Sequence, residues 1–158
     1  MSRCYLDTNF LYAHLRSGRR TPRPVAAWRA RVVSEITDSA GVISALVLDE
    51  LAYRLVLAWL RDDGDSDPLS AYRRDTRNVM RAVRSRLSMT WDAIDSLSLE
   101  LQPTSHAVVA MARGLMSQPG VAPRDAFHAA HALEAGCDVI VSSDAGFDGV
   151  PGLARLAP

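Results

Sequence analysis

Short apolar runs alternate with long helical patterns along this chain, and this alternation limits its fold more than any other feature. The runs are rich in β-branched residues and cover residues 3–6, 41–43 and 138–141, with a weaker fourth run at 98–101 before Pro103. Strands that alternate with helices form strand-helix-strand units around a parallel sheet. We therefore expect one α/β domain over residues 1–158, in which helices flank a mostly parallel, Rossmann-like sheet in three layers.

Apolar residues recur at helical spacing between these runs. Amphipathic helices are expected at about 25–36 and 69–87, a nearly all-apolar helix at 46–60, and a further helix at 123–135. The stretch 61–68 is interpreted as a polar connector, with Asp67 as the cap and Pro68 in the first turn of the next helix. Its aspartates alternate as in a calcium loop, but the glycine and distant glutamate of such a loop are absent. A longer helical segment is expected at about 61–97.

Composition excludes several classes of protein. The sequence is 48% hydrophobic and 23% charged, which is typical of an ordinary globular protein. It contains no apolar run long enough to span a bilayer and no leader-like N-terminus, so we expect a cytoplasmic protein. Cys4 and Cys137 both fall in short apolar runs, where a buried thiol packs well. Neither a disulfide framework nor a cysteine metal site is expected.

Charge gives no general reason to expect nucleic-acid binding, because 18 basic residues balance 18 acidic residues. Their distribution is more informative, since every basic residue is an arginine. The arginines gather at Arg16, Arg19, Arg20, Arg23, Arg29 and Arg31, and again between Arg73 and Arg86. Arginine suits phosphate oxygens, but two solvated helix faces explain the clusters equally well. Both interpretations stay open at this point.

Four acidic residues are predicted to meet at one edge of the sheet. Ligands of parallel sheets bind at the carboxyl ends of the strands. Asp7 follows the first strand, Glu50 lies on the helix after the second, and Asp144 follows the last. Asp125 lies in the first turn of the helix at 123–135, whose N-terminus faces the same edge.

Four carboxylates this close repel one another unless a cation lies between them. Ligands that are all oxygen suit one or two Mg²⁺ or Mn²⁺ ions rather than zinc. Such a site hydrolyses phosphodiester bonds without a protein nucleophile. The sequence therefore indicates a metal-dependent phosphodiesterase.

Each acid also has a structural alternative. Asp7 is a suitable helix cap, and Glu50 has Arg54 one turn further along its helix. Asp125 favours a helix dipole, and Asp144 precedes Gly146 as a turn residue would. The conjunction of all four at one edge favours the metal site.

Supporting residues are expected around the acids. Asn9, Ser44 and Ser142 are near enough in the predicted topology to orient a carboxylate, although a helix start, an N-cap and a loop hydroxyl explain them too. For Ser44 we expect a hydrogen bond to Asp7. His128 and His131 are interpreted as packing residues, with a ligand role as the minor alternative. Asp148 is an alternative fourth ligand, and more simply a turn residue beside Gly149.

The order and spacing of these motifs resemble a known family. The motifs are Tyr5-Leu6-Asp7-Thr8-Asn9, Ile43-Ser44 with Glu50-Leu51, Arg124-Asp125-Ala126-Phe127-His128-Ala129-Ala130, and Val141-Ser142-Ser143-Asp144 with Phe147 and Gly152-Leu153. Together they resemble PIN-domain ribonucleases, and among these the VapC-type toxins. The final motif departs from the family in having serine where threonine is common, which keeps the hydroxyl group.

The resemblance implies that Asp7, Glu50, Asp125 and Asp144 are the catalytic metal ligands of a ribonuclease. It implies Mg²⁺ or Mn²⁺ as cofactor and cleavage of single-stranded or loop RNA to a 5′-phosphate and a 3′-hydroxyl. It further implies a toxin of a type II toxin-antitoxin pair that forms a homodimer and binds a cognate antitoxin. Membrane association is not expected.

Two other functions compete with this interpretation. A haloacid-dehalogenase-like phosphatase also begins with an Asp after its first strand, but it needs a second Asp where this chain has Asn9, and the chain contains no lysine. A degenerate PIN fold that binds RNA or protein without catalysis would have lost some of the acids, and here all four are present.

Overall fold

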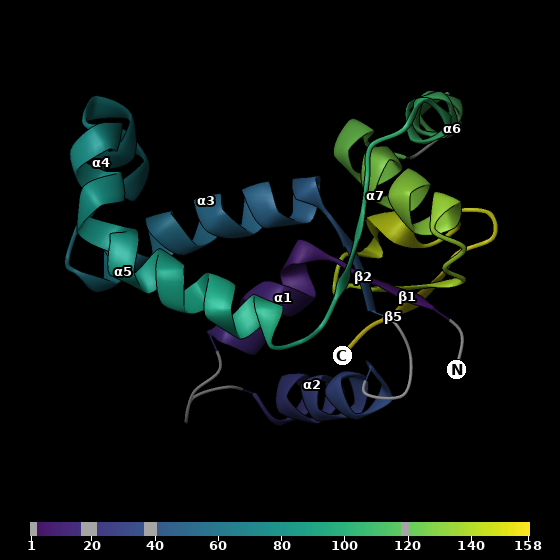
Figure 1. The fold of residues 1–158 in the computed structure, drawn as a ribbon, viewed down its shortest axis with the longest axis horizontal. Coiled ribbons are helices and arrows are strands. Elements are labelled where there is room, and N and C mark those ends of the chain that lie inside the picture. The colour runs from purple at the N-terminus through teal and green to yellow at the C-terminus, as the bar shows by residue number, and fades with distance from the viewer. Residues whose placement is uncertain (1–2, 17–21, 37–40, 118–120) are drawn as a thin grey trace.

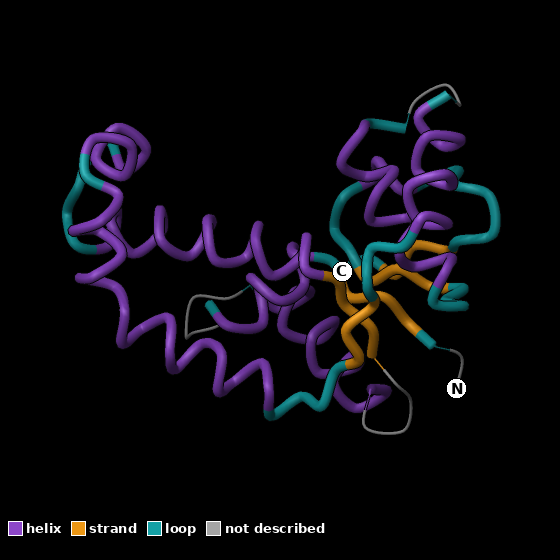
Figure 2. The backbone as a smooth tube through the Cα atoms, turned by 45° about the horizontal axis from the view of Figure 1, so that its top comes forward, coloured by secondary structure: helices purple, strands orange, loops and turns teal. Residues whose placement is uncertain are grey.

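The computed structural model describes residues 3–16, 22–36, 41–117 and 121–158. Within these ranges, one five-stranded sheet has the order β3-β2-β1-β4-β5, and every neighbouring pair is parallel. The strands are β1 (Cys4–Leu6), β2 (Gly41–Ser44), β3 (Glu100–Gln102), β4 (Val139–Val141) and β5 (Ala154–Leu156). The expected parallel α/β fold is confirmed (Figure 2).

The centre of the sheet is the centre of the core. Every residue of β1 and β2 is buried, as is typical of parallel strands covered on both faces. Tyr5 and Leu6 are fully buried, and β1 pairs with β2 on one side and β4 on the other. Because all strands are parallel, their carboxyl ends lie along one edge.

Helices cover both faces of this sheet. They are α1 (Thr8–Leu15), α2 (Arg23–Ile36), α3 (Ala45–Asp62), α4 (Pro68–Arg74), α5 (Thr76–Asp95), α6 (His106–Met116) and α7 (Pro123–Glu134). Figure 1 shows α6 and α7 on one side of the sheet and α1 and α2 on the other. Phe10 of α1 packs edge-on against Trp28 of α2, with ring centroids 5.2 Å apart. This contact joins the two helices beneath the sheet.

A helical arm formed by α3, α4 and α5 extends from the sheet (Figure 1). Its N-terminal part follows the prediction, because α4 begins at Pro68 and Asp67 accepts a hydrogen bond from the Ser70 amide. The prediction of a single helix over residues 69–87 is wrong. Asp75 leaves helical geometry and caps α5 by accepting from the Asn78 amide, so the segment is two helices with a break between them.

Helix α6 and strand β5 were not expected from the sequence. Helix α6 begins after Ser105, whose hydroxyl accepts from the Val108 amide, and β5 adds a short edge strand beside β4. The weak strand expected at 98–101 lies slightly further along as β3, since Ser98 adopts a positive φ of 50° that no strand residue has. The strand still ends before Pro103.

Two acids at the start of the connector, Asp62 and Asp63, form ion pairs with neighbouring helices. Asp62 pairs with Arg16 and Asp63 with Arg86, which ties α3 to α1 and to α5. These ion pairs agree with a structural connector rather than a calcium loop. Both cysteines are buried. None of the helices in the described ranges is long and apolar enough to cross a membrane.

Candidate functional site

Asp7 stands at the carboxyl end of β1, and its carboxylate is held from three sides. Its side chain is buried, and Oδ1 accepts from the Thr8 amide at 2.7 Å, which caps α1. Oδ2 accepts from Ser142 Oγ at 2.6 Å and from Asn9 Nδ2 at 3.0 Å. Asp7 is therefore a helix cap, but its oxygens keep acceptor capacity that these bonds do not use.

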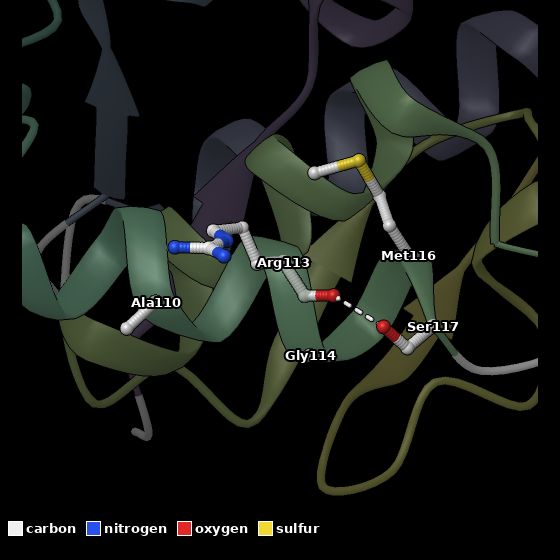
Figure 3. Close-up of a pocket in the computed structure, with 5 residues that line it drawn as sticks. All are labelled: Ala110, Arg113, Gly114, Met116 and Ser117. Atoms are coloured by element: carbon white, nitrogen blue, oxygen red, sulfur yellow. Dashed lines mark hydrogen bonds between the residues drawn. The ribbon is translucent and has the colours of Figure 1, made fainter.

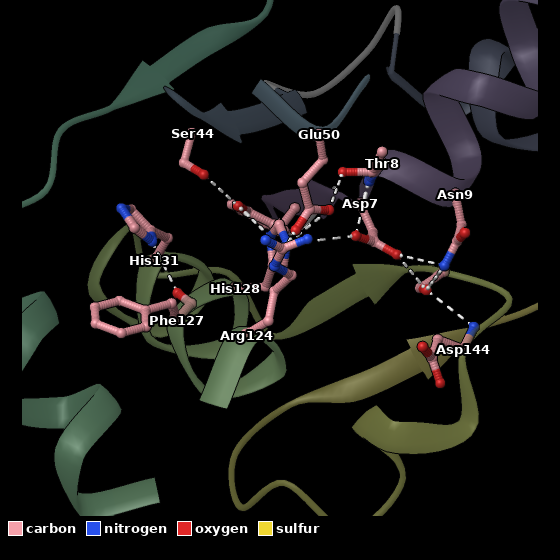
Figure 4. A network of polar contacts seen from close by, with 12 residues as sticks. Asp7, Thr8, Asn9, Ser44, Glu50, Arg124, Phe127, His128, His131 and Asp144 are labelled. Carbon is pink, nitrogen blue, oxygen red and sulfur yellow. Dashed lines mark hydrogen bonds and ion pairs between the residues drawn. The ribbon is translucent and has the colours of Figure 1, made fainter. Parts of the chain in front are cut away.

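Glu50 reaches the same place from α3, and its surroundings keep it ionised (Figure 4). Thr8 Oγ1 donates to Oε2 at 2.9 Å, and Arg124 Nε lies 2.9 Å from Oε1 as an ion pair. Burial raises the pKa of Glu50, but His128, Thr8 and Arg124 outweigh burial and hold it below its usual range. Among the described residues, no group donates a well-aligned hydrogen bond to Oε1.

The structure contradicts the alternative pairing of Glu50 with Arg54. Arg54 instead donates to Asn9 Oδ1 at 2.7 Å, and its guanidinium lies 4.5 Å from the centre of the Tyr12 ring. This stacked and hydrogen-bonded arginine is held at the wall of the site. Asn9 thus joins Arg54 to Asp7.

Asp125 and Asp144 approach each other over Gly146. Asp144 Oδ1 accepts from the Gly146 amide at 2.9 Å. A Cβ atom on Gly146 would lie 2.7 Å from Asp125 Oδ2 and 3.2 Å from Asp144 Oδ1. Burial and the charge of Asp144 raise the pKa of Asp125, with a smaller opposing effect of His128. A side chain at position 146 would therefore displace the Asp125 carboxylate from its present position.

All four acids line one cleft of about 280 Å³. Its lining consists of Asp7, Thr8, Asn9, Glu50, Arg54, Arg124, Asp125, His128, Asp144 and Phe147. A larger hollow over α6 is lined by Ala110, Arg113, Gly114, Met116 and Ser117 (Figure 3). That hollow contains no carboxylate, so the acidic cleft is the candidate site.

Ser44 does not act as expected. It occupies the N-cap position of α3 without a side-chain cap bond, and its hydroxyl lies 2.6 Å from the Tyr5 hydroxyl instead of bonding Asp7. The Tyr5 hydroxyl lies between Ser44 and His128 of α7, 3.1 Å from His128 Nδ1. Ser44 therefore contacts Tyr5 and not Asp7. Ser44 therefore lies behind the cleft rather than in it.

The two histidines of α7 have different surroundings although both are buried. His131 Nδ1 lies 2.8 Å from the Phe127 carbonyl oxygen, and its Nε2 lies 3.0 Å from Thr104 Oγ1. Burial lowers the pKa of His131. These contacts make it a packing residue, as interpreted from the sequence. His128 instead lines the acidic cleft.

Asp148 lies away from the acids and pairs with Arg155, whose Nε is 2.8 Å from Oδ1. It does not line the cleft. Of the N-terminal arginines, Arg19 and Arg20 lie outside the described residues. Sequence reasoning did not select Arg124, Arg54 or Gly146, although Arg124 directly precedes Asp125 and Gly146 follows Asp144 by two residues.

The donor set is chemically suited to a divalent cation. Oxygens of Asp7 and Glu50 and a ring nitrogen of His128 all lie within 4.8 Å of one another. The raised pKa of Asp125 indicates a shortage of positive charge, and Glu50 Oε1 is buried without a hydrogen bond from any described residue. A cation in the cleft would supply that charge.

Three solved structures have the same fold over nearly their whole length. VapBC2 from Rickettsia felis, bound to a DNA fragment from its promoter, has a TM-score of 0.62 and 17% identity, with 97% of this chain and 98% of that chain covered. FitAcB from Neisseria gonorrhoeae has a TM-score of 0.57 and 20% identity, covering 98% and 97%. A toxin-antitoxin complex from Klebsiella pneumoniae has a TM-score of 0.51 and 16% identity, covering 96% and 95%.

No curated protein matches the sequence. At such low identity, the three structures establish a shared fold and nothing finer. The PIN domain family, in contrast, matches residues 4–153 and so includes every acid of the cleft. With a parallel sheet whose carboxyl edge carries these acids, this chain belongs to the PIN domain family.

Proposed function

We propose that this protein is a metal-dependent endoribonuclease that hydrolyses RNA phosphodiester bonds. The observation that carries the proposal is the convergence of Asp7, Glu50, Asp125 and Asp144 on one cleft. Membership of the PIN domain family, whose members are generally nucleases, supports it. A phosphatase of the haloacid-dehalogenase type is disfavoured, because Asn9 donates to Asp7 where that mechanism needs an acid.

The four acids are proposed to hold one or two Mg²⁺ or Mn²⁺ ions. When bound, such a cation supplies Lewis acidity and neutralises charge for phosphodiester hydrolysis. Asn9 and Ser142 keep Asp7 oriented, and Thr8 does the same for Glu50. These positioning bonds are formed before substrate arrives, which lowers the cost of organising the site.

Arg54 and Arg124 are proposed to receive the RNA phosphate. Arg124 is two-thirds exposed at the mouth of the cleft, with its Nε beside Glu50, so its other donors face solvent. Arg54 is held in place by Asn9 and Tyr12. Their positive charges offset repulsion between an RNA backbone and the carboxylates, and arginine matches phosphate geometry.

The proposed reaction consumes one water molecule. Its oxygen bonds to phosphorus while the bond between phosphorus and the 3′-oxygen breaks, and that oxygen takes a proton. The products are a 5′-phosphate and a 3′-hydroxyl, as the resemblance to PIN-domain ribonucleases implies. Single-stranded or loop RNA is the proposed substrate, because a paired backbone is less free to enter a cleft of about 280 Å³.

We further propose that the protein is the toxin of a type II pair and works in the cytoplasm as a homodimer controlled by a cognate antitoxin. The support is similarity to VapBC2 and to a solved toxin-antitoxin complex. The experiment for this step is co-expression with a small protein encoded beside it, followed by co-purification and recovery of growth.

Metal removal tests the proposed chemistry directly. Purified protein should cleave single-stranded RNA with Mg²⁺ or Mn²⁺, lose cleavage in excess EDTA, and recover it when the metal is restored. Mapping of the RNA ends should find 5′-phosphates and 3′-hydroxyls. Cleavage that persists in EDTA would contradict the proposal. RNA binding without cleavage in saturating metal would favour the non-catalytic binding module.

Gly146→Ala should weaken cation binding with little loss of stability. The new methyl group would occupy the space of Asp125 Oδ2 and crowd Asp144 Oδ1. Displacing a proposed ligand should cost at least roughly 10–100-fold in affinity, the range known for the loss of an outer-shell partner of a ligand. Isothermal titration with Mn²⁺ measures the change.

Gly114→Ala is the matched control. Gly114 lies on α6 with no atom within 4 Å of an added Cβ, so its cation affinity should equal that of the wild type. Equal affinities of the wild type and Gly146→Ala would show that Asp125 and Asp144 do not bind the ion.

A further inference from the structure

A buried nitrogen faces the acids of the cleft without a hydrogen bond. The side chain of His128 is only 2% exposed, and its Nε2 has no hydrogen-bond partner among the described residues. This atom lies 3.4 Å from Glu50 Oε2 and 4.0 Å from Asp7 Oδ1. These contacts have ion-pair distances but no hydrogen-bond geometry, and buried polar atoms are normally hydrogen-bonded, so a ligand among the three groups would satisfy this nitrogen.

The other ring nitrogen of His128, Nδ1, contacts Tyr5 on the side away from the carboxylates. The Tyr5 hydroxyl lies 3.1 Å from Nδ1 and 2.6 Å from Ser44 Oγ. When Nδ1–H donates to Tyr5 and Tyr5 donates to Ser44, the lone pair of Nε2 points at the carboxylates. Histidine ligands of metals are oriented by such a second bond.

The spacing suits coordination of a single ion. Ligand atoms of Asp7, Glu50 and His128 lie within 4.8 Å of one another. With metal-ligand bonds of about 2.1 Å, adjacent ligands of an octahedron are about 3 Å apart and opposite ones about 4.2 Å apart. The two nitrogen-oxygen distances of 3.4 and 4.0 Å fall within this range. No large movement of the three side chains is required.

We propose that His128 Nε2 is a metal ligand together with Asp7 and Glu50, so that the site is mixed nitrogen and oxygen rather than oxygen alone. Imidazole suits transition metals, whereas Mg²⁺ prefers oxygen. The site therefore prefers Mn²⁺ to Mg²⁺. Asp125 and Asp144 lie on the other wall, beside Gly146. This inference rests on the proposed function only in that the cleft binds a divalent cation.

Pulsed electron paramagnetic resonance of the Mn²⁺-loaded protein tests the inference without measuring activity. The wild type should show coupling of Mn²⁺ to a directly bound ¹⁴N nucleus, and labelling with ¹⁵N-histidine should change the pattern. Titration calorimetry should find Mn²⁺ bound more tightly than Mg²⁺, since Mg²⁺ is a hard cation that takes oxygen ligands and so gains less from an imidazole nitrogen.

His128→Leu should remove the nitrogen coupling and the preference for Mn²⁺. His131→Leu is the matched control, because His131 is equally buried on α7 but bonds Phe127 and Thr104 instead of facing the acids. Should His128→Leu fail to fold, the wild-type spectrum decides by itself.

The outcomes separate the two proposals. Bound Mn²⁺ without a coordinated nitrogen would overturn the histidine ligand and leave an oxygen-only nuclease site. Absence of binding by either cation would overturn both the ligand and the metal-dependent function.

Discussion

Asp7→Asn should lower the rate of RNA cleavage by more than about 100-fold, the upper end of the cost of losing an outer-shell partner of a metal ligand. The carboxylate of Asp7 is buried and ordered by Thr8, Asn9 and Ser142, so its charge is held at the place where the cation is proposed to bind. Asparagine keeps the shape and can still accept from the Thr8 amide. Single-turnover cleavage of a labelled RNA measures the loss, and circular dichroism checks the fold.

Asp148→Asn is the control for this change. Asp148 is exposed, pairs with Arg155 and does not line the cleft. Its replacement should leave cleavage unchanged. Wild-type cleavage by Asp7→Asn would refute the assignment of Asp7 as a ligand, even if the protein proved to be a nuclease.

Phe10→Ala should lower the free energy of unfolding by about 3–5 kcal/mol, the usual cost of removing a buried aromatic ring. Phe10 is fully buried and packs edge-on against Trp28. It also fixes α1, whose first residues Thr8 and Asn9 hold the acids. Urea denaturation followed by tryptophan fluorescence measures the change.

Met89→Ala provides the comparison, because Met89 is 72% exposed on α5. A surface change of this kind is expected to alter the unfolding free energy by about 0.5 kcal/mol or less. A cost below about 1 kcal/mol for Phe10→Ala would mean that the contact between α1 and α2 contributes little to stability.

The residues at the carboxyl edge of the sheet were predictable because each strand is recognisable from a local run of apolar residues. Buried strands are apolar runs, and a parallel sheet brings the residues after them together wherever they lie in the sequence. Asp7, Glu50 and Asp144 could therefore be selected from the amino-acid sequence alone. The edge strand β5 could not, because it is short, partly exposed and paired on one side only.

Side-chain partners were harder to predict than positions. The sequence offered Arg54 as the partner of Glu50 at helical spacing, yet Arg124 from α7 takes that place. The break at Asp75 was hidden for a similar reason, since apolar residues continue the helical spacing through it while its side chain caps α5. Both outcomes depend on competition between partners, which periodicity does not describe.

The parallel sheet also determines when the cleft can exist during synthesis. Its acids enter from four places between residues 7 and 144, and β1 is central only once β4 pairs beside it. In a nascent chain that does not yet include β4 and Asp144, one wall of the cleft is missing. Strand β1 then also lacks its neighbour β4. Any activity of the cleft therefore requires that β4 and Asp144 have been synthesised, and a translation product that ends before Asp144 cannot carry the assembled site.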